Sequence, residues 1–143
     1  MAAETRVEAY VLDAYALFAY LAGEASAPHV RVLLDAAAVG KAHVLMCVVN
    51  LGEVFYRYIR EHGQAAAERA LSLTDSLPVE FVGVDRLLAL AAAQLKGCHR
   101  MSYADCFAAA LAQEVDATLV TGDPEFRQVQ DVVRIEWLEA TGR

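Results

Sequence analysis

The stretch VEAYVLDAYALFAYLAG at residues 7–23 decides the expected fold, because it joins two kinds of element through a single acid. Residues 7–12 form a short apolar run, which is typical of a buried strand. Residues 14–23 have the pattern of a helix that stops near Gly23. Asp13 therefore stands where a strand ends and a helix begins.

The same order of strand and helix continues along the chain. Further strands are expected at 43–49, 79–84, 117–122 and 132–138, the last at an edge of the sheet. Further helices are expected at 28–38, 50–63, 64–76, 85–97 and 102–114. Apolar strands alternating with helices predict an α/β fold with three layers, in which a central, mostly parallel sheet of about five strands is covered by helices on both faces. Ligands of such folds bind beyond the carboxyl ends of the strands.

Composition sets limits on function. The 143 residues, 57% of them hydrophobic, fit a single domain over residues 1–143 with its core at about 7–137. The net charge of −7 argues against binding nucleic acid by bulk electrostatics, although nucleic acid stays possible as a substrate. The longest uncharged run, residues 42–52, is shorter than the ~20 residues that span a bilayer. Because the amino terminus also lacks the layout of a signal peptide, a soluble cytoplasmic protein is expected.

Asp13 and Asp123 each have a simple structural explanation. An Asp before a helix caps its first turn, which contributes ~1 kcal/mol, and Asp123 is followed by Pro124 at a favoured first helical position. Both acids also follow strands that are expected to be parallel, so both can face the crevice at the carboxyl ends of the sheet. The two interpretations stay open for each residue.

Glu53 and Asp105 lie on expected helices. Glu53 has Arg57 four residues later, and a salt bridge between them is its simplest local explanation. Ser102 and Asp105 resemble a capping box, although Glu or Gln is the usual second residue. The helix surface beyond Asp105 is alanine, and an acid with apolar surroundings needs a partner or a metal ion.

Together these four acids indicate a metal site. Two acids at strand ends and two on helices, converging on one crevice, form an all-oxygen ligand set that suits Mg²⁺ or Mn²⁺. The lack of His or Cys ligands disfavours zinc. The three cysteines have no CxxC spacing, so neither a zinc site nor a disulfide framework is indicated.

Four motifs carry a resemblance to a known family. They are VLDAYALFAYLAGE around Asp13, VNLGEVFYR around Glu53, MSYADCFAAALA around Asp105 and TLVTGDPEF around Asp123. In this order and spacing, from about residue 7 to residue 137, the chain resembles the PIN-domain ribonucleases. Within them it is similar to the VapC-type toxins of type II toxin–antitoxin (VapBC) systems.

The resemblance implies a function and a site. Asp13, Glu53, Asp105 and Asp123 would be the acidic quartet that binds one or two Mg²⁺ or Mn²⁺ ions. The implied reaction is endonucleolytic hydrolysis of RNA, with a metal-activated water attacking phosphorus in line. A VapB-type antitoxin would neutralise the toxin, which would work as a homodimer away from any membrane.

Further residues qualify this expectation. Thr121 and Ser102 are candidate supporting hydroxyls, and Arg57 and Arg100 could hold phosphates of the RNA. The family often has Ser or Thr after the first aspartate, where this chain has Ala14. The missing hydroxyl leaves open a catalytically degenerate PIN fold that binds RNA or a protein. A haloacid-dehalogenase-type phosphatase or a response-regulator receiver fits poorly, because the additional acids that each would need near Asp13 are missing.

Overall fold

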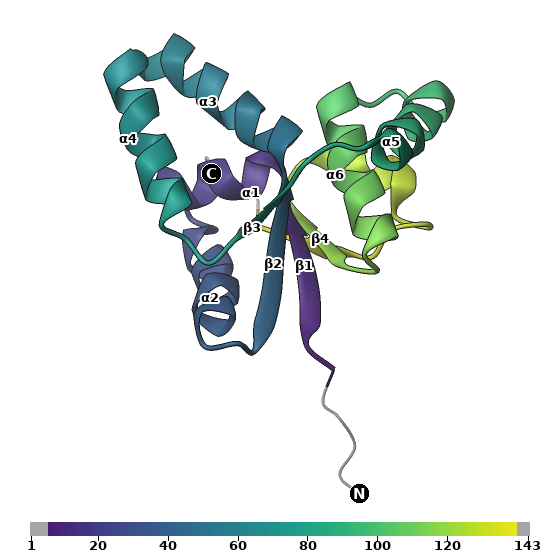
Figure 1. Ribbon diagram of the computed structural model, residues 1–143, viewed down its shortest axis with the longest axis horizontal. Helices are drawn as coiled ribbons and strands as arrows, with labels where there is room; N and C mark the ends of the chain where they lie inside the picture. The colour runs from purple at the N-terminus through teal and green to yellow at the C-terminus, as the bar shows by residue number, and fades with distance from the viewer. Residues whose placement is uncertain (1–5, 140–143) are drawn as a thin grey trace, which may run out of the picture.

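A five-stranded parallel sheet forms the centre of the computed structural model, which describes residues 6–139 (Figure 1). The strand order is β3–β2–β1–β4–β5, and every neighbouring pair is parallel. The strands are β1 (Glu8–Leu12), β2 (Ala42–Cys47), β3 (Glu80–Val82), β4 (Thr118–Thr121) and β5 (Ile135–Trp137). The expected α/β fold class is confirmed, and β5 lies at an edge as expected.

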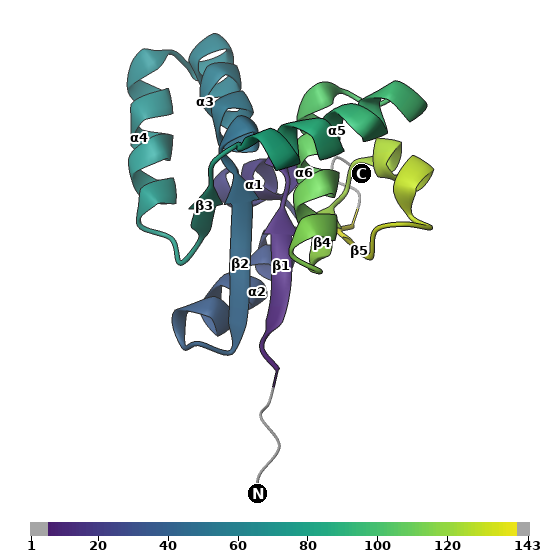
Figure 2. The same cartoon turned by 45° about the vertical axis from the view of Figure 1, so that its right-hand side comes forward.

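Helices cover both faces of the sheet. They are α1 (Ala14–Leu21), α2 (Ala27–Ala38), α3 (Val48–His62), α4 (Gln64–Asp75), α5 (Arg86–Cys98), α6 (Tyr103–Glu114) and the 3₁₀ helix η1 (Pro124–Val129). Side chains alternate along a strand, so Val11 and Leu12 of β1 face opposite layers. Val11 packs with residues of α5, α6 and η1, whereas Leu12 packs with residues of α1 and α2. Figures 1 and 2 show α2 and α6 on opposite sides of the sheet.

The pair α3 and α4 extends away from the sheet as two helices lying side by side (Figures 1 and 2). A separate apolar cluster joins α3 to α1 and β2, with Val54 packed among Ala14, Leu17 and Met46. This packing holds the first half of α3 beside the start of α1. It therefore brings Glu53, the neighbour of Val54, near Asp13.

All five expected strands are longer than the observed ones. Val48 and Val49 begin α3 instead of ending β2, and β3 and β5 contain only three residues each, within the expected 79–84 and 132–138. Strand length here is set by pairing. β2 pairs with β1 up to Leu45 and with β3 up to Cys47, and within residues 6–139 its pairing ends there. A continuous apolar run cannot reveal this limit, because it suits a buried helix as well as a strand.

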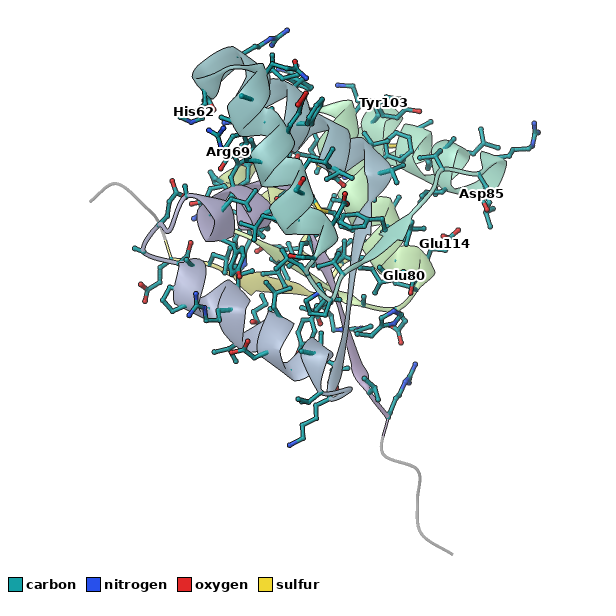
Figure 3. The ribbon with its side chains drawn as sticks, turned by 60° about the vertical axis from the view of Figure 1, so that its left-hand side comes forward. His62, Arg69, Glu80, Asp85, Tyr103 and Glu114 are labelled. Atoms are coloured by element: carbon teal, nitrogen blue, oxygen red, sulfur yellow. The ribbon has the colours of Figure 1, made fainter. Side chains whose placement is uncertain are left out.

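The start of α5 shows an ordinary exposed helix cap. Asp85 accepts a hydrogen bond of 2.9 Å from the backbone N–H of Leu88. Its side chain lies at the surface (Figure 3). Asp85 is thus a natural reference for the capping acids at the carboxyl end of the sheet. Among the helices described over residues 6–139, none is both long and apolar enough to cross a bilayer.

Candidate metal centre

Asp13 and Asp123 lie side by side because β1 and β4 are adjacent and parallel. Asp13 follows the last residue of β1, and Asp123 follows β4 by two residues. Thr121 connects them: its hydroxyl donates to Asp13 Oδ2 at 2.5 Å and accepts the backbone N–H of Asp123 at 3.0 Å. Thr121 is completely buried. Its hydroxyl therefore fixes the first acid relative to the turn that carries the second.

Both aspartates also cap helices, as their local sequences predict. Asp13 Oδ1 accepts the N–H of Ala16 at 2.9 Å, and Asp123 Oδ1 accepts the N–H of Glu125 at 2.9 Å. Asp13 is only 1% exposed. Burial raises its pKa to about 7, an effect that the hydrogen bonds from Thr121 and Ala16 reduce and the charges of Asp123 and Glu53 increase. Capping thus accounts for one oxygen of each aspartate, but not for the burial of Asp13.

Glu53 turns a carboxylate toward the same region from α3. Its Oε2 lies 3.9 Å from Arg57 Nη1, so the expected ion pair exists but is long. Its Oε1 is buried and has no hydrogen-bond partner in the described structure. Burial raises the pKa of Glu53, Arg57 lowers it, and Asp123 raises it. A buried carboxylate oxygen without a partner is costly unless something else binds it.

Asp105 lies in the first turn of α6 and is 8% exposed. Ser102 caps this helix by accepting the N–H of Asp105 at 3.1 Å, but the reciprocal half of the expected capping box is replaced, because the Ser102 N–H donates to Glu125 instead of to Asp105. Burial, a hydrogen bond with the Glu125 carboxyl group and the charges of Asp13 and Asp123 raise the pKa of Asp105 to about 8.

Glu125 is a fifth acid that the sequence reasoning did not identify. It lies in η1 and accepts the backbone N–H of Ser102 at 2.9 Å. The hydrogen bond with Asp105 and the N–H of Ser102 lower its pKa. Glu125 therefore joins η1 to the start of α6, next to the expected ligand. The one available signal was its position two residues after Asp123, and an acid there is equally typical of a first helical turn.

All four acids of the expected quartet line one pocket of about 180 Å³. The remaining lining residues are Ala14, Tyr15, Phe18, Glu24 and Arg57. Within residues 6–139, no three His, Cys, Asp or Glu side chains are gathered tightly enough to hold an ion in their present positions. The four acids thus line the same pocket, but in their present positions their carboxylates are too far apart to coordinate one ion.

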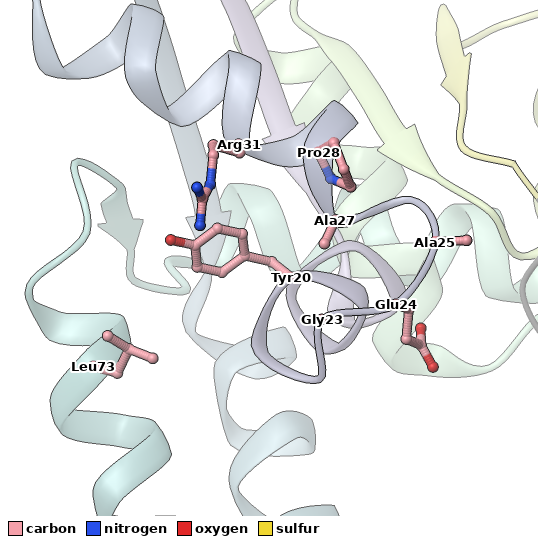
Figure 4. Close-up of a pocket in the computed structure, with 8 residues that line it drawn as sticks. All are labelled: Tyr20, Gly23, Glu24, Ala25, Ala27, Pro28, Arg31 and Leu73. Atoms are coloured by element: carbon pink, nitrogen blue, oxygen red, sulfur yellow. The ribbon is translucent and has the colours of Figure 1, made fainter.

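A larger cavity of about 580 Å³ lies between the α1–α2 region and α4 (Figure 4). Its walls are mostly apolar and include Tyr20, Pro28 and Leu73. Glu24, which also lines the acidic pocket, is the only acid in its lining among the described residues. Cavity volume therefore does not identify the metal site. Of these two cavities, only the smaller one has several carboxylates converging on it.

The two candidate basic residues differ in position. Arg57 lines the acidic pocket. Arg100 is outside the lining that the described residues form, and its backbone N–H and C=O pair with the amide of Gln128 at 3.0 and 3.1 Å. Ala14 is part of the pocket wall, so the hydroxyl that the family often has there is missing from the wall itself.

The donor set is suited to a hard divalent cation. Carboxylate oxygens are the ligands that Mg²⁺ and Mn²⁺ prefer, and the partnerless Glu53 Oε1 is a buried donor that a cation would satisfy. The charges of neighbouring acids raise the pKa values of Asp13 and Asp105, as expected where negative charges are gathered. The residues present therefore fit such an ion.

Solved structures with the same fold include toxin–antitoxin proteins. The VapBC2 complex of Rickettsia felis, bound to a DNA fragment from its promoter, has a TM-score of 0.73 at 16% identity, covering 92% of this chain and 99% of that one. VapC20 of Mycobacterium tuberculosis, a sarcin–ricin loop cleaving toxin, has a TM-score of 0.68 at 19% identity, covering 93% and 99%. VapBC from Salmonella typhimurium, bound to DNA, has a TM-score of 0.67 at 20% identity, covering 92% and 98%. At these identities the likeness shows a shared fold.

Comparison with known sequences bears on family membership, which the structural likeness alone does not show. No curated protein sequence matches this chain. The sequence model of the PIN domain matches residues 10–132, which include all four acids of the expected quartet. The chain therefore belongs to the PIN domain family.

Proposed function

We propose that this protein is a metal-dependent endoribonuclease of the VapC toxin type, which hydrolyses phosphodiester bonds of RNA. One observation carries the proposal: four carboxylates from four separate elements line a single pocket at the carboxyl end of the sheet. Capping can explain Asp13 and Asp123, and an ion pair can explain Glu53. Neither explains why Asp13 and Asp105 are buried together next to the others.

The pocket would hold one or two Mg²⁺ or Mn²⁺ ions through Asp13, Glu53, Asp105 and Asp123. Such an ion supplies an activated water and stabilises negative charge at the phosphate. Glu53 and Asp123 are only half-buried, so their side chains can rotate inward toward a cation. Asp13 and Asp105 would release protons on binding, because pKa values of about 7 and about 8 keep Asp13 partly and Asp105 mostly protonated at pH 7 without a cation.

The remaining polar residues position these ligands. Thr121 orients Asp13 through its hydroxyl, which leaves the cap hydrogen bond to Ala16 intact on the other oxygen. Ser102 holds both the start of α6 and Glu125, and so fixes the wall that carries Asp105. The substrate phosphate would enter from the open side of the pocket, where Glu24 and Arg57 are exposed.

The partners follow from what the structural neighbours are. The neighbours from Rickettsia felis and Salmonella typhimurium were solved as VapBC complexes, and we extend this arrangement to the present chain. It would be neutralised by a VapB-type antitoxin and act in the cytoplasm as a homodimer, with residues 1–143 forming one PIN domain.

A second candidate function is binding of RNA or protein without cleavage. The observation that favours it is Ala14, which contributes a methyl group to the pocket wall where the family often has a hydroxyl. All four acids of the quartet are present, which favours the nuclease.

Cleavage of a mixed RNA pool tests the proposal. The wild type, Asp13→Asn, Asp105→Asn and the control Asp85→Asn would be compared in Mg²⁺, Mn²⁺ and EDTA, after circular dichroism has shown that all are folded. Asp85 caps a helix with the same geometry as Asp13 but lies outside the pocket. We expect metal-dependent cleavage by the wild type and Asp85→Asn alone. A folded, antitoxin-free wild type that cuts no RNA with either metal would favour the binding function instead.

A further inference from the structure

Arg57 is the only basic residue that the described structure places in the lining of the acidic pocket. Its guanidinium carbon lies 4.2 Å from the centre of the Phe18 ring, which also lines the pocket. Phe18 in turn stacks on Tyr58, with ring centres 5.6 Å apart and an interplanar angle of 12°. Arg57 is thus packed against a fixed aromatic surface. Its guanidinium has a defined place before any ligand binds.

The hydrogen-bonding capacity of this guanidinium is unused. Among the hydrogen bonds formed within residues 6–139, none involves the Arg57 side chain, and the contact with Glu53 is an ion pair of 3.9 Å. The side chain is 44% exposed. A guanidinium carries five N–H donors in a planar fork. Packing against Phe18 covers part of the side chain but engages none of these donors.

The charges of the pocket lining indicate which ligand the Arg57 guanidinium would bind. The pocket is lined by five carboxylates and one guanidinium, so an RNA phosphate would meet repulsion from most of its walls. A cation held by the acids relieves part of that repulsion. Among the described residues of the lining, Arg57 carries the one positive charge, and a planar fork matches two oxygens of a phosphate. The pocket, at about 180 Å³, is also small enough that a phosphate inside it lies beside the four acids.

We infer that Arg57 binds the non-bridging oxygens of the phosphate that is cleaved, with Phe18 holding its guanidinium in position. This assignment rests on the proposed nuclease function and adds a substrate contact to it. The contact strengthens as negative charge develops on the phosphate oxygens during attack. Lysine would supply a similar charge without the planar fork or the same packing on Phe18.

Arg57→Gln and Arg57→Lys test the inference, with Arg60→Gln as the matched control. Arg60 lies on the same helix and also packs on an aromatic ring, 4.9 Å from the centre of Tyr56, but it does not line the pocket. For Arg57→Gln we expect kcat/KM on RNA to fall about 100-fold, mostly through kcat. For Arg57→Lys we expect kcat/KM to fall about 10-fold or more. Arg60→Gln should stay within about 3-fold of the wild type. Full activity in Arg57→Gln or Arg57→Lys would overturn the assignment.

Binding of Mn²⁺ alone separates substrate binding from a structural role. If Arg57 only oriented Glu53, its loss would weaken Mn²⁺ binding as much as cleavage, and that result would overturn the inference. Contact with phosphate predicts equal or tighter Mn²⁺ binding in Arg57→Gln, because a positive charge leaves the acidic pocket.

RNA binding in Ca²⁺ tests the contact even if the wild type cuts no RNA, an outcome that would refute the nuclease proposal itself. The inference predicts that Arg57→Gln weakens this binding by about 5-fold and lowers its salt dependence. Equal RNA affinity in the two proteins would overturn it.

Discussion

Replacing Asp13 by Asn in the metal-free protein should change how stability depends on pH. Burial raises the pKa of Asp13 from its ordinary value of 3.8 to about 7 in the folded protein. Between these values the folded protein keeps a proton that the unfolded chain releases. The stability that this proton contributes is present below pH 4 and is lost as the pH rises through 7. Asn cannot titrate, so the variant lacks this dependence.

The expected difference follows from the size of the shift. Between pH 5 and the folded pKa of about 7 lie two pH units, each worth about 1.4 kcal/mol. The free energy of unfolding of the wild type should therefore fall by about 3 kcal/mol more than that of Asp13→Asn between pH 5 and pH 8. Urea denaturation in EDTA at both pH values measures this. The Asn side chain can keep the cap to Ala16, so the variant should stay folded.

Asp85→Asn is the matched control for this experiment. Asp85 makes the same cap hydrogen bond of 2.9 Å but is exposed (Figure 3). Its substitution should leave the pH dependence of the wild type unchanged. A gap between wild type and Asp13→Asn that is equal at pH 5 and pH 8 would refute the argument that burial keeps Asp13 protonated.

Three further predictions concern the same pocket. At pH 8, Mn²⁺ at 100 times its Kd should stabilise the wild type by about 2.7 kcal/mol in urea titrations, and Asp13→Asn should show far less of this gain. Thr121→Val removes the hydroxyl that joins Asp13 to the backbone of Asp123, so the free energy of unfolding should fall by about 1–3 kcal/mol and RNA cleavage should fall as well. Thr121→Ser should restore both. An active Thr121→Val would contradict this role. Gly122→Ala places a Cβ against the ring of Tyr15, closer than van der Waals contact allows, so chemical denaturation should show a loss of about 1–3 kcal/mol in the free energy of unfolding. An unchanged midpoint would show that the ring moves freely.

The sequence predicts the fold and the general place of the site through local rules. Apolar strands alternating with helices imply parallel pairing, and parallel pairing puts the residues after β1 and β4 at one edge. This rule alone predicts that Asp13 and Asp123 lie close together. Asp105 was identified by a different signal, the absence of any local charge partner on an alanine surface, and the structure places this acid in a buried position.

Contacts between distant elements were beyond these rules. Glu125 pairs with Asp105 across twenty residues of sequence, which depends on how η1 packs against α6. Nothing in the local sequence of Phe18 indicates that its ring would support Arg57 from another helix. Local patterns also cannot determine where β2 ends, because its length depends on the strands beside it.

Direct measurement of Mn²⁺ binding tests the central claim, that four acids from separate elements form one divalent metal site. Isothermal titration calorimetry at pH 8 would compare the wild type with Asp13→Asn, Glu53→Gln, Asp105→Asn and Asp123→Asn, and with Asp85→Asn as control. We predict saturable binding to the wild type and the control, weakened at least about 10-fold in each of the four pocket variants. Unchanged affinity in the four folded variants would contradict the account, because the four acids would then have only structural roles.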